Sequence, residues 1–198
     1  FNTVKVNLLR TIALGGSAMA SPMYVDALVG TPFAVVLKDA LVRQEDVRLI
    51  NGNPLTGTKS CLEDSVGVKT SEITAIPEGA DANEMFGWIM PRTNQFSTSR
   101  SYFSWLMGKK EYDLDARVKG GERHIIMSGE YDSVLPMDIY GEFLIKAIIA
   151  GDIDKMEQLG IYEVSPEDFA LAEFVDSSKL ELQRIVREGL NMLRKENA

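Results

Sequence analysis

The segment from Ile139 to Val175, IYGEFLIKAIIAGDIDKMEQLGIYEVSPEDFALAEFV, decides the fold of the last third of this 198-residue chain. Its first part, residues 139–150, is apolar on nearly every side, which predicts a helix that is buried on most faces. Gly151 is placed to end this helix, and Asp152 is placed to cap a second, short helix. Ser165, followed by a proline and two acidic residues, is a start signal for a third helix. The last third is therefore predicted to be helical.

Polar residues around these helices carry further predictions. Asp138 directly precedes the apolar helix and is expected to cap its amino end. Within that helix, Glu142 and Lys146 are four residues apart, a spacing that lets them pair. Apolar residues then recur every three or four positions over residues 182–193, which predicts an amphipathic closing helix. The positions of this helix that should face outward are Arg184, Arg187 and Glu188.

Strand patterns dominate the first 80 residues. Apolar and polar residues alternate from Val4 to Leu14, which predicts a strand that Gly15 and Gly16 should break. Thr31 is expected to cap a short helix that has Pro32 at its first position. Further strands are predicted at Tyr24–Leu28, Arg48–Asn51 and Val66–Ile76. The order strand, strand, helix, strand is typical of a β-grasp module.

Residues 77–83 have the composition of a linker, because proline, glycine and small polar residues gather there without periodicity. The sequence therefore predicts two domains, at residues 1–80 and 84–198. In the second domain, residues 85–91 are expected to form a strand and residues 99–107 an aromatic-rich helix. The predicted fold class is α+β: a β-grasp module followed by a β-containing, mainly helical domain.

Composition excludes several classes of function. A net charge of −8 argues against binding to nucleic acid or to anionic lipid through a basic patch. The single cysteine, Cys61, excludes an internal disulfide and an iron–sulfur cluster held by this chain alone. The single histidine, His124, leaves no histidine-rich zinc site. The glycine pairs do not fit a nucleotide-binding fingerprint. We therefore expect no catalytic group, no metal site and no electron-carrying cofactor in this chain.

Several stretches of sequence resemble a known family. VNLLRT at residues 6–11, TPFAVVL at residues 31–37 and RLINGNPLTGTK at residues 48–59 are similar to the ligand-binding β-grasp domain of the A subunit of the sodium-translocating NADH:quinone reductase. FGWIMP at residues 86–91, followed by FSTSR at residues 96–100, resembles a strand and turn of the same protein. The helical segment also resembles the C-terminal part of this protein. The chain, which begins at a phenylalanine, is thus expected to be its C-terminal half.

The resemblance implies a role within a bacterial respiratory complex. That complex oxidises NADH, reduces ubiquinone or menaquinone, and pumps sodium ions. The A subunit would be peripheral, at the cytoplasmic face of the inner membrane, against the integral membrane B subunit and the other subunits. Flavins and iron–sulfur clusters would belong to those other subunits. The chain departs from the family at Asp176, where many members have a cysteine, so thiol chemistry at that position is not carried over.

Candidate site residues follow from this implied role. His124 could hydrogen-bond a quinone oxygen or relay a proton, or it could be an exposed histidine without function. An aromatic group could form a slot for a quinone ring, or it could be ordinary core. Its members are Phe86, Trp88, Phe96, Tyr102, Phe103 and Trp105. Cys61 is expected to be an inert thiol.

Two other functions remain open at this point. The β-grasp module could bind a small soluble ligand by itself, in the manner of vitamin carriers. Alternatively, the whole chain could be a structural clamp that positions neighbouring subunits and contacts no substrate. In each of the three cases the chain by itself is expected to be catalytically inactive.

Overall fold

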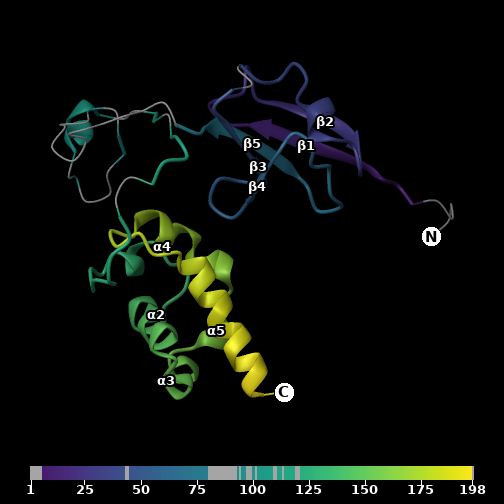
Figure 1. Ribbon diagram of the computed structural model, residues 1–198. Coiled ribbons are helices and arrows are strands. Elements are labelled where there is room, and N and C mark those ends of the chain that lie inside the picture. Colours follow the sequence, from purple (N-terminus) through teal and green to yellow (C-terminus); the bar gives the residue numbers. More distant parts are fainter. Residues whose placement is uncertain are drawn as a thin grey trace. The chain divides into compact units, whose positions relative to one another are not determined.

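The structure is a computed structural model, and its internal contacts divide the chain into two units, residues 1–117 and 118–198. Figure 1 shows the sheet of the first unit and the helices of the second. The structure describes residues 6–42, 45–79, 93, 95–96, 100, 102–108, 111–112, 114–118 and 121–197. The predicted domain boundary between residues 80 and 84 lies outside the described residues and stays a prediction.

A five-stranded mixed sheet forms the first unit (Figure 1). Its strands are β1 (Leu9–Gly15), β2 (Met23–Leu28), β3 (Val47–Asn51), β4 (Thr58–Ser60) and β5 (Glu72–Pro77). They lie in the order β2-β1-β5-β3-β4, with β1 and β5 parallel and the other neighbours antiparallel. The short helix α1 (Phe33–Val36) connects β2 to β3. This arrangement is the β-grasp fold, and the predicted fold class is confirmed.

One face of this sheet packs against α1. Ile12 and Leu14 of β1 and Ile73 of β5 are at most 2% exposed and share a core with Phe33 of the helix. Directly after β1, Gly16 has φ +107°, and a Cβ there would lie 2.1 Å from the carbonyl oxygen of Ala75. Only glycine therefore fits this position, where the chain leaves β1 against β5.

Two of the predicted strands are longer than the observed ones. β1 begins at Leu9, and Val6, which is 83% exposed, is not part of it, whereas the predicted start at Val4 lies outside the described residues. β5 begins at Glu72 rather than Val66, because a turn interrupts the predicted strand. In that turn, Thr70 N–H donates to the Gly67 carbonyl, and Gly67 N–H donates to the Thr70 hydroxyl.

The predicted helices of the first unit are also corrected. Pro32, not Thr31, is the N-cap residue of α1, and the helix has no side-chain cap. The Thr31 carbonyl instead accepts from Val66 N–H, next to an isolated antiparallel bridge between Pro32 and Ser65. Of the predicted helix at residues 99–107, a 3₁₀-helix over Phe103–Met107 is present. The predicted strand at residues 85–91 lies outside the described residues.

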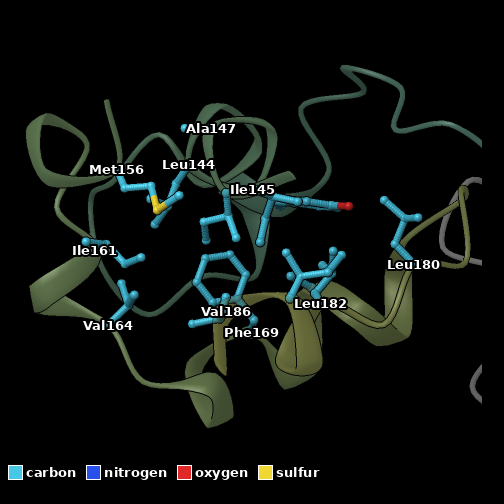
Figure 2. Packing of buried hydrophobic residues seen from close by; sticks show 14 of the residues in the cluster. Leu144, Ile145, Ala147, Met156, Ile161, Val164, Phe169, Leu180, Leu182 and Val186 are labelled. Atoms are coloured by element: carbon cyan, nitrogen blue, oxygen red, sulfur yellow. The ribbon is translucent and has the colours of Figure 1, made fainter. Parts of the chain in front are cut away.

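Four α-helices build the second unit: α2 (Gly141–Ala150), α3 (Ile153–Gln158), α4 (Ala170–Val175) and α5 (Leu182–Glu196). Short 3₁₀-helices at Tyr131–Ser133, Ile161–Glu163 and Pro166–Phe169 connect them. Figure 2 shows how side chains from these segments converge on one apolar core. Fully buried members of this core are Leu144, Ile145, Met156, Phe169, Leu182 and Val186.

The predicted helix ends are largely confirmed. Gly151 ends α2 with φ +69°, and Asp152 caps α3 by accepting from Lys155 N–H at 3.1 Å. Ser165 forms a capping box with Asp168, although the first turn after it is a 3₁₀-helix that leads into α4.

Two predictions about α2 are wrong. Its N-cap residue is Tyr140, not Asp138, and no side chain caps this end. Glu142 does not pair with Lys146. It is 5% exposed and accepts from Ser128 and Gly129 instead. Because the segment before α2 folds back over the first turn, a carboxylate there satisfies backbone donors that would otherwise lack partners.

Among the described residues, no helix is both long enough and apolar enough to cross a membrane. In the same part of the chain, no group of three or more histidine, cysteine, aspartate or glutamate side chains is placed to bind a metal ion.

Cys61 is exposed. A hydrogen bond to the Glu63 carboxylate raises the pKa of its thiol, because ionisation would place two negative charges together. This environment disfavours the reactive thiolate.

Candidate functional site: a groove in the helical unit

A groove of about 880 Å³ lies within the second unit, between residues 122–125, the carboxyl end of α2 and one side of α5. Its apolar lining comes from Ile125, Ile148, Ile149, Leu180, Ile185 and Met192. Its polar lining comes from Glu122, Arg123, His124, Arg184 and Glu188. An apolar cleft of this size with a few polar groups is the usual form of a site for a small molecule, for which volumes of roughly 300–1,000 Å³ are typical.

Two sets of hydrogen bonds hold the wall that carries His124. At one end, Arg123 N–H donates to the Ser178 carbonyl at 2.8 Å, and Ile126 N–H donates to the Ser178 hydroxyl at 3.3 Å. At the other end, the buried Glu142 carboxylate accepts from Ser128 N–H at 3.0 Å and from Gly129 N–H at 2.8 Å. The extended segment is therefore fixed against the helices although it has no secondary structure of its own.

The opposite wall is formed by α5, which packs closely on α2. A Cβ at Gly189 would lie 3.0 Å from side-chain atoms of Ile148 and Ile161, so glycine allows the close approach of the two helices. Arg184, on the exposed side of α5, pairs with Glu181 and with Glu188, the latter at 2.8 Å. Glu181, followed by Glu188, raises the pKa of the Arg184 guanidinium. As predicted, Arg184 and Glu188 face outward.

The charges of the described residues that line the groove cancel. Two arginines face two glutamates in its lining, and the pairing of Arg184 with Glu188 neutralises one of each. The exposed side chains of Arg123 and His124 add hydrogen-bond donors at the rim. This combination suits a neutral, largely apolar molecule that carries hydrogen-bond acceptors at one end.

Among the residues predicted to face a quinone, His124 lies in this groove and is exposed. The aromatic candidates belong to the other unit. There, Phe96 packs edge-to-face on Tyr112 with ring centroids 5.8 Å apart, and the Arg100 guanidinium lies 5.7 Å from the ring centroid of Trp105. Tyr102 is half-buried, whereas Phe86 and Trp88 lie outside the described residues. A site that these aromatic residues share with His124 stays a prediction.

Sequence reasoning missed the apolar part of the groove. Ile149 is 55% exposed and Met192 is 37% exposed, yet in the sequence they look like ordinary members of an apolar helix and an amphipathic helix. A signal was present for Ile149, because the predicted helix is apolar on more faces than a small unit can bury.

Comparison with known proteins shows which proteins this chain is similar to. Residues 11–61 match the family described as the NQRA C-terminal domain. Over 197 residues, the chain is 32% identical to the A subunit of the Na(+)-translocating NADH-quinone reductase of Neisseria meningitidis serogroup B and to that of Vibrio atlanticus. The corresponding protein of Pasteurella multocida is 31% identical over the same length. These matches cover 99% of this chain and 44% of each relative, so the chain spans less than half the length of these relatives.

The family match falls on β1 to β4 and α1 of the β-grasp unit and ends before β5. The similarity to the relatives continues through the helical unit, which contains the groove. Residues 11–61 therefore carry the NQRA C-terminal domain, and the chain as a whole is similar to the C-terminal region of the A subunit of the Na⁺-translocating NADH-quinone reductase.

Proposed function

We propose that this chain serves as a peripheral part of a sodium-pumping NADH:quinone reductase, at the cytoplasmic face of the bacterial inner membrane. It docks on the membrane subunits, among them the integral B subunit, and offers the groove of its helical unit to ubiquinone or menaquinone. The relatives are named as subunits of such an enzyme, and this supports the assignment. By itself the chain is proposed to be inactive.

The composition of the groove is the observation that carries the quinone proposal. A quinone is uncharged, has an apolar ring and tail, and carries two carbonyl oxygens that only accept hydrogen bonds. The groove has an apolar lining, a balanced set of charges, and donors at its rim from Arg123 and His124. A fatty acid or a nucleotide would instead favour a groove with an excess of positive charge.

We further propose that the chain holds no electron carrier of its own. Its sequence contains one cysteine and one histidine, whereas an iron–sulfur cluster needs several thiolates from the protein. Electrons would then pass between cofactors of other subunits, and this chain would act by binding and positioning. Purified protein that retained stoichiometric iron, haem or flavin would contradict this part of the proposal.

Isothermal titration calorimetry tests the quinone proposal, by measuring how tightly the purified chain binds a short-chain ubiquinone analogue. Ile149→Asn places an amide in the apolar lining, and we expect it to weaken binding about tenfold, the equivalent of about 1.4 kcal/mol of lost burial. Phe143→Asn is the matched control, because Phe143 lies on the same helix, is 54% exposed and does not line the groove. His124→Ala should weaken binding without lowering the melting temperature.

The absence of saturable quinone binding, or equal weakening by the two asparagine variants, would leave the structural clamp as the better interpretation.

Docking is tested separately, by co-purification of the chain with membranes that carry the other subunits. Arg187→Glu reverses a charge on the exposed face of α5, where the side chain is 65% exposed. We expect this variant to lower recovery of the chain, because a reversed charge disfavours the original contact.

A further inference from the structure

A second pocket, of about 400 Å³, lies in the β-grasp unit. Ile12 and Leu14 of β1 point into the core beneath α1, so the alternating residues Ala13 and Gly15 face the other side of the sheet. On β5, Glu72 pairs with Ala13, and Thr74 pairs with Gly15. All four line the pocket, which therefore opens on the sheet face that α1 does not cover.

Tyr112 and Leu114 lie on the other side of this pocket. Ala116 N–H donates to the Pro77 carbonyl at 2.9 Å, which ties the chain after Leu114 to the end of β5. The Tyr112 ring also packs edge-to-face on Phe96. The pocket is therefore bounded by a sheet on one side and by an anchored segment on the other.

Glu72 gives this pocket its chemical character. It is half-buried, and among the described residues of the lining it is the only charged one, with no arginine, lysine or histidine beside it. Within the described part of the chain, its carboxylate has no hydrogen-bond or ion-pair partner, whereas the Thr74 hydroxyl donates to the Gly52 carbonyl at 2.8 Å. A half-buried carboxylate without a counter-charge attracts a cation, and an aromatic face such as that of Tyr112 does the same.

We propose that this pocket binds a small organic cation, whose ammonium group contacts Glu72 and whose apolar part lies against Tyr112 and Leu114. The site belongs to the β-grasp unit alone, so it does not depend on the quinone proposal for the groove of the helical unit. The pocket volume lies in the lower part of the range for sites of small molecules, roughly 300–1,000 Å³.

Amide spectra of the full ¹⁵N-labelled chain at pH 7 provide the test, with benzylamine as the probe. Benzyl alcohol has the same ring without the charge, and benzoate has the opposite charge. We expect benzylamine to shift the amide signals of Gly15, Gly16 and Thr74 in a saturable way. We expect weaker binding of benzyl alcohol and no shifts at these residues with benzoate.

Two variants test the assignment to this pocket. Glu72→Gln keeps the shape of the side chain and removes its charge, and we expect it to weaken benzylamine binding about fivefold while leaving benzyl alcohol unaffected. Gly15→Leu should block both compounds. A Cβ there would meet no atom within 4 Å, and φ is not in the left-handed region, so the new side chain can enter the pocket.

Glu63→Gln is the matched control, because this exposed glutamate lies in the same unit but outside the pocket. Its neighbour Leu62 packs with the core beneath α1. This variant should bind benzylamine like the wild type. The proposal is overturned if Glu72→Gln leaves benzylamine binding unchanged, if benzyl alcohol binds as tightly as benzylamine, or if the shifts map elsewhere. If Gly15→Leu perturbs the whole spectrum, the comparison of Glu72→Gln with Glu63→Gln decides.

Discussion

Glu142→Ala is the change that should loosen the helical unit and its groove most directly. The carboxylate accepts from Ser128 N–H at 3.0 Å, from the Ser128 hydroxyl at 3.1 Å and from Gly129 N–H at 2.8 Å. These bonds hold the segment that carries His124. The side chain also lies in the first turn of α2, where a negative charge stabilises the helix.

The expected loss of stability follows from these contacts. Three hydrogen bonds contribute about 1 kcal/mol each, and the helix dipole adds about 0.5 kcal/mol. Ser128 and Gly129 are exposed, so water can reach their donors after the change, which keeps the cost near 3 kcal/mol. Glu142→Gln retains an oxygen acceptor and loses only the charge, so about 1 kcal/mol is expected.

Urea unfolding followed by circular dichroism at 222 nm measures this loss. Nearly all described α-helix belongs to the second unit, whereas both tryptophans, Trp88 and Trp105, precede residue 118. The dichroism should therefore report Glu142→Ala, while tryptophan fluorescence should stay unchanged. With a urea dependence of about 1 kcal/mol per molar for a unit of this size, the midpoint should fall by about 3 M.

Asp154→Ala provides the control, since Asp154 is an exposed acid in the first turn of α3. It should cost less than about 0.5 kcal/mol. The reasoning is refuted if Glu142→Ala costs no more than this control, or if Glu142→Gln is as damaging as Glu142→Ala. Either result would mean that the three hydrogen bonds do not hold the groove wall.

Three further predictions concern single positions. Gly16→Ala should prevent the β-grasp unit from folding, because the added Cβ overlaps β5. The dispersed amide signals of this unit should then be lost, and a native spectrum would contradict this. Tyr131→Phe should leave the free energy of unfolding in urea unchanged or raise it by up to about 1 kcal/mol. The buried hydroxyl has no hydrogen-bond partner among the described residues, and burial, followed by Asp176, raises the pKa of Tyr131. A loss above about 1 kcal/mol would reveal a partner. Arg48 lowers the pKa of Glu78, so this pair should stabilise the β-grasp unit above about pH 4.5, and that contribution should be lost as the pH falls through the lowered pKa of Glu78. The protection of the β3 and β5 amides, corrected for the intrinsic exchange rate, should fall over this range in the wild type and less so in Glu78→Gln; identical pH profiles would sink this assignment.

Local signals in the sequence were sufficient for most helix ends and for the fold class. Gly151, Asp152 and Ser165 act through their own backbone and their nearest neighbours, so their roles can be predicted without knowledge of the fold. The same local logic failed for Asp138 and Thr31. Each has a suitable side chain two or three residues before its helix, but distant segments decided where the helix begins.

The sequence by itself determined the order of β1, β2, α1, β3 and β5 and of the helices α2 to α5, the apolar stripe of α5 and the presence of a lone histidine in a polar stretch, whereas β4 was not predicted. Tertiary structure decided which of these residues meet. Arg123 and His124 lie beside Ile149 and Met192 because Ser178 and Glu142 hold an extended segment against the helices. Contacts between residues so far apart in the chain depend on packing of the whole unit, and no local pattern of residues encodes them.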